Sequence, residues 1–330
     1  MAYDFDVIIA GSYSADLIFT GMQGLPQLGM DTVGSDFLMT PGEAYISAVS
    51  MHRLGVKVGW AADFGNDDFS LFALKCAREE GLDETLFIHH DRPYRRISAA
   101  ASYPEDRMFI TYYDPDPQVP AVIPALVKNR ARVLYLPGLY TGKLLSAGKK
   151  LVSRKGMQLV MDGNSSVGDI TGKSRQSSLV RQAIRSADIF LPNALEARRL
   201  TGDQDLAIAA WRLAEHCKNV IIKDGPNGSL AYVAGHIYTM PAIPVKPVDT
   251  TGAGDNFSAG FLCAWLNGQP VDTCLKWGNI TGGLSTTATG GTYPKITRDD
   301  VLIYLENWPD NSSVSTGHRK HEENYENRAH

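Results

Sequence analysis

Short apolar runs alternate along the chain with longer stretches in which apolar residues recur every three or four positions. The short runs are typical of strands buried on both faces of a sheet, and the longer stretches have the period of amphipathic helices. The predicted strands are 7–10, 56–61, 133–136, 159–161, 189–191, 220–222 and 237–248, and the predicted helices are 44–54, 69–80, 144–154, 179–186, 194–200 and 206–217. This alternation predicts an α/β fold with a mainly parallel sheet.

Two stretches depart from the alternation. Residues 31–40 have an extended pattern, and 97–113 have a strand–turn–strand pattern with the turn at 104–106. We expect these stretches to form strands outside the main parallel sheet.

Composition excludes several classes of protein. The net charge of −4 gives no basic excess, which argues against a nucleic-acid partner. No apolar run reaches the length of a membrane span, so we expect no membrane association. The start of the chain is acidic and lacks the basic residues that open a signal peptide, so we expect the protein in the reducing cytoplasm. The four cysteines are scattered, with Cys263 and Cys274 placed as core residues. Residues 309–330 are polar and are predicted to be a mobile tail.

The most informative motif lies at residues 249–257, DTTGAGDNF, just before a helical pattern. The start of a helix presents unpaired N–H groups and a positive dipole, and Gly252 and Gly254 let the backbone wrap closely around an anion. A carboxylate at such a site, Asp255, is repelled by a phosphate unless it accepts a proton. The motif therefore indicates phosphoryl transfer to a hydroxyl group.

Three other interpretations of glycine-rich segments are open. The motif could be a dinucleotide fingerprint, but Phe257 stands where a small residue is needed. It could also be a plain helix N-cap. Elsewhere, residues 168–174 look like a phosphate-binding P-loop but have one residue too few between the glycines.

The segment 249–257 resembles the C-terminal signature of the ribokinase-like, PfkB-type carbohydrate kinases. The resemblance implies a three-layer α/β/α sandwich over 1–308 with a mainly parallel sheet and a small β-sheet lid, for which we predict segments 15–20, 31–40 and 97–113. It also implies ATP and Mg²⁺, with Gly252, Ala253 and Gly254 as the anion hole and Asp255 as the catalytic base. The predicted reaction is transfer of the γ-phosphoryl group of ATP to a hydroxymethyl group of a sugar-like molecule.

The acceptor site is expected at two segments near the lid. Asp16 follows the first strand and matches a family residue that binds substrate hydroxyls, although a loop Asp can also simply form an Asx-turn. Gly42 and Glu43 fall at the first family signature, where Ile46 replaces an Asn that binds a sugar hydroxyl in the family. This departure favours a less polar or differently shaped acceptor, with Glu43 as an alternative acceptor of hydroxyl hydrogen bonds.

The nucleotide site is expected at three further segments. Asn193 and Glu196 match the family's Asn-x-x-Glu motif, with Glu196 holding Mg²⁺ through water; the alternative is a capping box at a helix start. Lys223, Gly225 and Gly228 resemble the turn beneath ATP, and Asn279 matches a position that often contacts adenine.

A monovalent-cation loop is also implied by the resemblance. Its candidate K⁺ ligands are Asp249 and Thr251, with backbone carbonyl groups near Thr286, Thr289 and Gly291. A bound cation would order the anion-hole turn from behind.

The substrate and assembly stay open at this level. A sugar kinase leads, a nucleoside kinase comes second, a phosphosugar kinase third, and a non-catalytic sugar or nucleotide sensor on the same fold is a further alternative. A basic cluster before residue 97, including Arg96, could bind a phosphorylated acceptor or could be a solvated loop. A homodimer through the lid is a further expectation.

Overall fold

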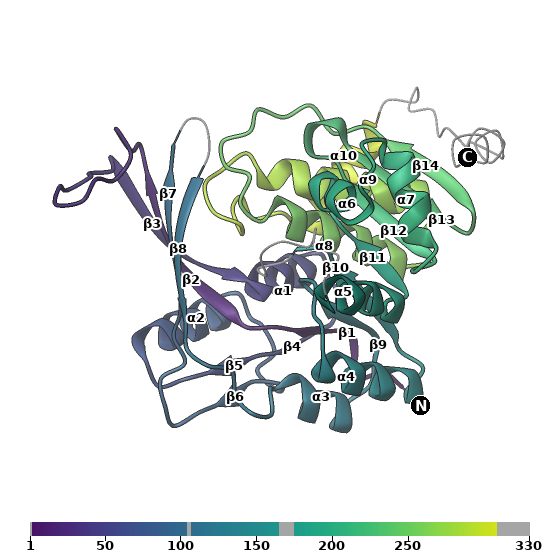
Figure 1. The fold of residues 1–330 in the computed structure, drawn as a ribbon, viewed down its shortest axis with the longest axis horizontal. Helices are drawn as coiled ribbons and strands as arrows, with labels where there is room; N and C mark the ends of the chain where they lie inside the picture. Colours follow the sequence, from purple (N-terminus) through teal and green to yellow (C-terminus); the bar gives the residue numbers. More distant parts are fainter. Residues whose placement is uncertain (1, 104–106, 165–174, 309–330) are drawn as a thin grey trace.

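The computed structural model describes residues 2–103, 107–164 and 175–308. The predicted turn at 104–106, the P-loop-like segment 168–174 and the tail 309–330 lie outside the described residues. Within the described part, the chain forms a large central sheet with helices on both faces and a smaller sheet that projects from one side (Figure 1).

The central sheet is mixed but mostly parallel. Within the described residues it has eight strands in the order β14-β13-β12-β11-β10-β9-β1-β4, and only β13 and β14 pair antiparallel with their neighbours. The strands are β1 (Phe5–Ala10), β4 (Val58–Ala61), β9 (Ala131–Leu136), β10 (Gln158–Asp162), β11 (Ile189–Leu191), β12 (Asn219–Lys223), β13 (Ser229–Val233) and β14 (His236–Met240).

Strand side chains alternate between two hydrophobic cores, which gives the three layers. Val7 and Ile9 of β1 point into one core, while Ile8 and Ala10 point into the other. The first core packs against α1 (Ala44–Arg53), α2 (Asp68–Glu79), α8 (Ala253–Leu266), α9 (Val271–Ser285) and α10 (Arg298–Glu306). The second packs against α3 (Val122–Lys128), α4 (Lys143–Arg154), α5 (Arg175–Ser186), α6 (Ala194–Thr201) and α7 (Leu206–Ala214).

The small sheet has the order β3-β2-β7-β8 and stands apart from the main body in Figure 1. Its strands are β2 (Tyr13–Thr20), β3 (Asp36–Glu43), β7 (Arg96–Ser102) and β8 (Arg107–Tyr113). Each predicted lid segment contributes to it, but 31–35 is not strand. Two further strands, β5 (Asp63–Phe64) and β6 (Ile88–His89), pair with each other and lie between β4 and β7 along the chain.

The predicted strand at 237–248 is too long. β14 ends at Met240, and an irregular segment leads to α8. Pro241, Pro244 and Pro247 explain the difference, because a proline cannot donate a hydrogen bond to a neighbouring strand. This segment carries the chain across the edge of the sheet where the candidate site lies.

Candidate functional site

The glycine turn before α8 is held tightly in place. Gly252 is the N-cap of α8 with φ +70°, a conformation that glycine adopts without strain. A Cβ at Gly252 would come within 2.8 Å of Gly291 Cα and 3.1 Å of the Ile46 side chain. The first amide groups of α8 have no acceptors within the helix, although Ala253 N–H donates to the Thr250 carbonyl at 3.3 Å. Ile46 thus packs against this turn instead of offering a polar group.

Asp255 lies in the first turn of α8 and is bound from the opposite helix. Its Oδ1 accepts a 2.8 Å hydrogen bond from Ser47 Oγ of α1. Burial, followed by repulsion from the Asp162 carboxylate, raises the pKa of Asp255 to about 7, while Ser47 and Lys223 act in the opposite direction. A carboxyl group with this pKa can both accept and release a proton near neutral pH.

Asp162, at the end of β10, is a site residue that the sequence patterns did not single out. Its carboxylate accepts hydrogen bonds from Lys223 Nζ at 2.7 and 2.8 Å, from Ser258 Oγ at 2.9 Å and from Tyr135 Oη at 3.2 Å. Its place directly after the apolar run 159–161 is the signal that could have found it, because ligands bind where parallel strands end. Lys223, predicted to reach phosphate, is therefore ion-paired with this buried carboxylate.

One cavity of about 580 Å³ lies between α8, α9 and the ends of β10 to β12, and we call it the α8-side cavity. Every residue predicted to bind ATP lines it: Asn193, Lys223, Gly225, Gly228, Gly252, Gly254 and Asn279. Ala253, Asp255, Glu196 and Thr286 line it as well. The structure thus brings together segments that are up to about ninety residues apart in sequence.

Asn193 and Glu196 form the capping box that was the alternative interpretation. Asn193 Oδ1 accepts from Glu196 N–H at 2.8 Å, and Glu196 Oε2 accepts from Asn193 N–H at 2.8 Å. Burial raises the pKa of Glu196. Capping and lining the cavity are compatible here, because both side chains remain on its wall. The carboxylates of Glu196 and Asp162 are oxygen ligands of the kind that Mg²⁺ takes, directly or through water.

Asn279 of α9 anchors the segment after β14. Its amide donates to the carbonyl oxygens of Met240 and Pro241 at 3.1 and 2.9 Å. Gly228 packs against the same segment so closely that a Cβ there would overlap Met240 O. Asn279 and Gly228 both line the α8-side cavity, so these contacts fix part of its wall.

Hydrogen bonds between protein groups hold the predicted cation loop in place. Asp249 Oδ1 accepts from Thr251 N–H and Oγ1, and Oδ2 accepts from Gly290 N–H. The Thr286 carbonyl accepts from Asp249 N–H at 3.1 Å, and the Gly291 carbonyl accepts from Asn256 Nδ2 at 2.8 Å. Thr289 follows in the same segment. Among the residues that the structure describes, no three His, Cys, Asp or Glu side chains gather as metal ligands.

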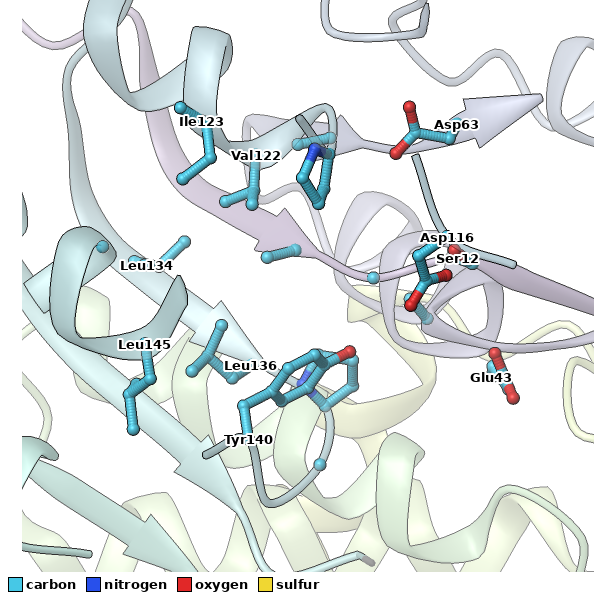
Figure 2. A pocket seen from close by; sticks show the side chains of 18 of the residues that line it. Ser12, Glu43, Asp63, Asp116, Val122, Ile123, Leu134, Leu136, Tyr140 and Leu145 are labelled. Atoms are coloured by element: carbon cyan, nitrogen blue, oxygen red, sulfur yellow. The ribbon is translucent and has the colours of Figure 1, made fainter. Parts of the chain in front are cut away.

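A second cavity of about 430 Å³ lies at the ends of β1, β4 and β9, between α3, α4 and the edge of the small sheet at Glu43 and Arg96, and we call it the lid-side cavity. Figure 2 shows the carboxylates of Glu43, Asp63 and Asp116 on one side of it and aliphatic side chains on the other, with Tyr140 between them. Asp255 lines this cavity as well as the α8-side cavity. The two cavities therefore meet at one titratable carboxyl group.

The predicted acceptor residues lie at this cavity or beside it. Glu43 lines it with backbone φ +54°, an uncommon conformation for a residue other than glycine, and burial raises its pKa. Asp16 of β2 is not among the lining residues. It accepts from Ser14 Oγ at 2.6 Å, and burial raises its pKa to about 6. A Cβ at Gly42 would overlap Asp16 Oδ2, which explains the glycine.

Two cavities that share one carboxyl group, with a helix start facing one of them, are the arrangement of a group-transfer enzyme with two substrates. The profile described as the pfkB family of carbohydrate kinases matches residues 34–298. The chain belongs to this family, and it is a phosphotransferase with an alcohol group as acceptor. The resemblance and the fold predicted from the sequence are both confirmed.

Individual relatives agree on the kinase fold and differ in their named substrates. The chain is 24% identical to a ribokinase of Bacillus subtilis over 306 residues, which is 90% of this chain and 98% of that protein. It is 37% identical to a cytidine kinase of Thermococcus kodakarensis over 134 residues, 39% of this chain and 47% of that protein. A solved E. coli protein described as a putative Ribokinase II, in complex with ATP and Mg²⁺, matches with a TM-score of 0.75 and 18% identity, covering 92% of this chain and 99% of that one.

None of the helices in the described part of the chain is both long and apolar enough to cross a bilayer.

Proposed function

We propose that this protein transfers the γ-phosphoryl group of ATP to a hydroxymethyl group of a sugar or sugar-like molecule. The observation that carries the proposal is the position of Asp255 on the walls of both cavities. The α8-side cavity, with the predicted nucleotide residues on its wall, takes ATP. The lid-side cavity takes the acceptor.

In the proposed reaction, Asp255 accepts the proton of the acceptor hydroxyl group while the hydroxyl oxygen forms a bond to the γ-phosphorus of ATP. The bond from that phosphorus to the bridging oxygen of ATP breaks, and ADP leaves. The amide groups of Gly252, Ala253 and Gly254 stabilise the negative charge on the transferred group, and Lys223 adds a positive charge beside Gly254. Bound Mg²⁺ would neutralise phosphate charge, with Glu196 and Asn193 on the wall that faces it.

Ser47 and Asp162 act on the proposed base from two sides. The Ser47 hydrogen bond orients the Asp255 carboxylate, and the Asp162 charge keeps its proton affinity high enough to accept a proton near neutral pH. Asp16 and Glu43 are proposed to orient the hydroxyl groups of the acceptor, because both belong to the small sheet, Asp16 on β2 and Glu43 at the end of β3. Closure of that sheet would exclude water, which protects ATP from hydrolysis.

The deciding experiment is an ADP-release assay with Asp255→Asn and a matched control. We expect the variant to lose at least three orders of magnitude in kcat, on the scale of removing a catalytic proton acceptor and its charge. Its affinity for ATP should stay within a few fold. Asp83→Asn makes the same chemical change at an exposed loop position and should keep wild-type turnover. Turnover by Asp255→Asn close to that of the control would refute the assigned base.

A nucleoside kinase of the same fold is the second candidate, supported by the 37% identity to a cytidine kinase over part of the chain. An acceptor panel of sugars, nucleosides and sugar phosphates separates the two candidates. A non-catalytic sensor would bind ATP without releasing ADP with any acceptor in the panel.

Potassium binding and dimerisation stay predictions. For K⁺, the test is the rate of ADP release in potassium-free and sodium-free buffer, measured with and without added K⁺. Equal rates would remove the ion from the proposal. A homodimer through the lid is supported by large apolar side chains exposed on the small sheet, among them Phe19, Phe37, Phe109 and Ile110. Light scattering of the wild type and of Ile110→Asp tests it.

A further inference from the structure

The lid-side cavity is larger and less polar than a hydroxymethyl group requires. Its volume of about 430 Å³ lies in the range of pockets that hold a whole small-molecule ligand. Part of its wall is aliphatic and comes from β9, α3 and α4. We call this part the aliphatic hollow; it is lined by Leu126 and by Val122, Ile123, Leu134, Leu136 and Leu145, which Figure 2 shows.

The hollow is unsuited to sugar hydroxyl groups. A hydroxyl group buried without a hydrogen-bond partner costs about 1–3 kcal/mol, and aliphatic walls offer no partner. Asp63, at one side of the cavity, already accepts from Ala121 N–H at 2.9 Å and contacts His90 Nε2 at 2.7 Å. The group that fits this space has an apolar surface.

The remainder of the lid-side cavity is polar and already rich in carboxylates. Arg96 forms ion pairs with Glu43 at 3.4 Å and with Asp116 at 3.3 Å, so its single positive charge faces two negative ones. Lys149, the other cation on the wall, pairs with Asp188 at 3.7 Å. A phosphate or carboxylate group on the acceptor would meet net negative charge here.

The polar part nevertheless has capacity for an uncharged oxygen atom. Arg96 Nε is buried and has no hydrogen-bond partner among the described residues. The Tyr94 hydroxyl contacts Ser12 Oγ and Asp116 Oδ1, both at 2.8 Å, on the same wall. Hydroxyl groups of a sugar satisfy such groups without adding charge.

We propose that the acceptor carries a flat, uncharged ring that occupies the aliphatic hollow, while its hydroxyl-bearing half lies between Glu43 and Asp255. The ring is an aryl group or a nucleobase, since both present an apolar face. This inference rests on the proposed kinase function and deepens it, because it selects neutral glycosides over free sugars and over phosphorylated sugars.

Gly148 of α4 gives a direct way to fill the hollow. It is buried, lines the cavity, and a Cβ there would meet only Leu126 Cδ1 at 4.0 Å. Leucine is also a better helix former than glycine, so Gly148→Leu should fold. Ala147→Leu adds a similar side chain at the exposed neighbouring position and serves as the matched control.

The test compares kcat/KM for two matched sets: ribose, phenyl riboside, cytidine and ribose 1-phosphate; and glucose and phenyl glucoside. In at least one set we expect a ring-bearing acceptor to exceed its free sugar at least tenfold in the wild type, with ribose 1-phosphate the poorest of its set. The phenyl and cytidine arms distinguish the two sources of the ring. Gly148→Leu should lower the ratio of ring-bearing to free sugar at least tenfold, and Ala147→Leu should leave that ratio unchanged.

Three outcomes overturn the inference: no preference for a ring, a preference for ribose 1-phosphate, or an unchanged ratio in Gly148→Leu. If Gly148→Leu is unfolded by circular dichroism, Leu145→Phe narrows the same hollow and must lower the same ratio. Phosphorylation of a free sugar without ring preference removes only this inference. Failure to phosphorylate any acceptor would remove the proposed function as well.

Discussion

Replacing Asp255 by asparagine should stabilise the protein at neutral pH while it abolishes turnover. The folded protein raises the pKa of this carboxyl group from 3.8 to about 7. Between these two values the native state holds a proton that the unfolded chain has released. The contribution of Asp255 to the free energy of unfolding therefore falls as the pH rises from about 4 to 7 and reaches its most destabilising value above 7. Asparagine resembles the protonated form and lacks this penalty.

The size of the effect follows from the same difference. About 3 pH units correspond to about 4 kcal/mol at roughly 1.4 kcal/mol per unit. Asp255 is only partly buried and faces two cavities, so solvent screening reduces the expected gain to about 1–2 kcal/mol at pH 8. Below pH 4 the two proteins should be equally stable.

Urea denaturation of the wild type and Asp255→Asn, followed by circular dichroism between pH 4 and pH 8, measures this difference. Asp83→Asn, at an exposed position, controls for the loss of one negative charge. If Asp255→Asn is no more stable than the wild type at pH 8, the reasoning about burial and charge at Asp255 is wrong.

Three other predictions concern the surroundings of Asp255. In a pH–rate profile, kcat/KM for the acceptor should rise with a midpoint near the Asp255 pKa of about 7, and Asp162→Asn should move that midpoint to lower pH by removing a like charge; an unmoved midpoint would contradict this coupling. Gly42→Ala should raise the acceptor KM about tenfold, because the added methyl group displaces Asp16, and leave the KM for ATP unchanged; steady-state kinetics that show equal acceptor KM values would remove Asp16 from the acceptor site. Ile46→Ala should lower the free energy of unfolding by about 2–4 kcal/mol and also lower kcat, because this side chain packs against the glycine turn; thermal denaturation with an unchanged midpoint would argue against that contact.

The order of strands and helices could be predicted from the sequence because each element carries its own period. The helices α1 and α2 end two residues before Gly55 and Gly81, and both glycines have positive φ angles, as their positions after apolar periods indicate. The exception is informative. Apolar residues after Met240 suggested a longer strand, but the prolines among them prevent the hydrogen bonds that a strand needs.

The candidate site could be predicted only where a motif marks it. Glycines and the helix start at 252–255 indicate an anion site through local backbone chemistry alone. Asp162 and Ser47 have no such local mark, since an isolated Asp or Ser is common in any chain. Their importance comes from contacts with residues 61 and 208 positions away in sequence, at Lys223 and Asp255 respectively.

By itself, the sequence determined most of the elements, the mainly parallel order of the sheet and the presence of a glycine-rich helix start with unpaired amides. These depend on short-range properties: period, glycine and proline positions, and the unpaired amides of a first turn. Only the tertiary structure placed one carboxyl group on two cavities, set its proton affinity through burial and Asp162, and left an aliphatic hollow between β9, α3 and α4. Burial and charge–charge distances arise from the packing of distant segments, so no local pattern encodes them.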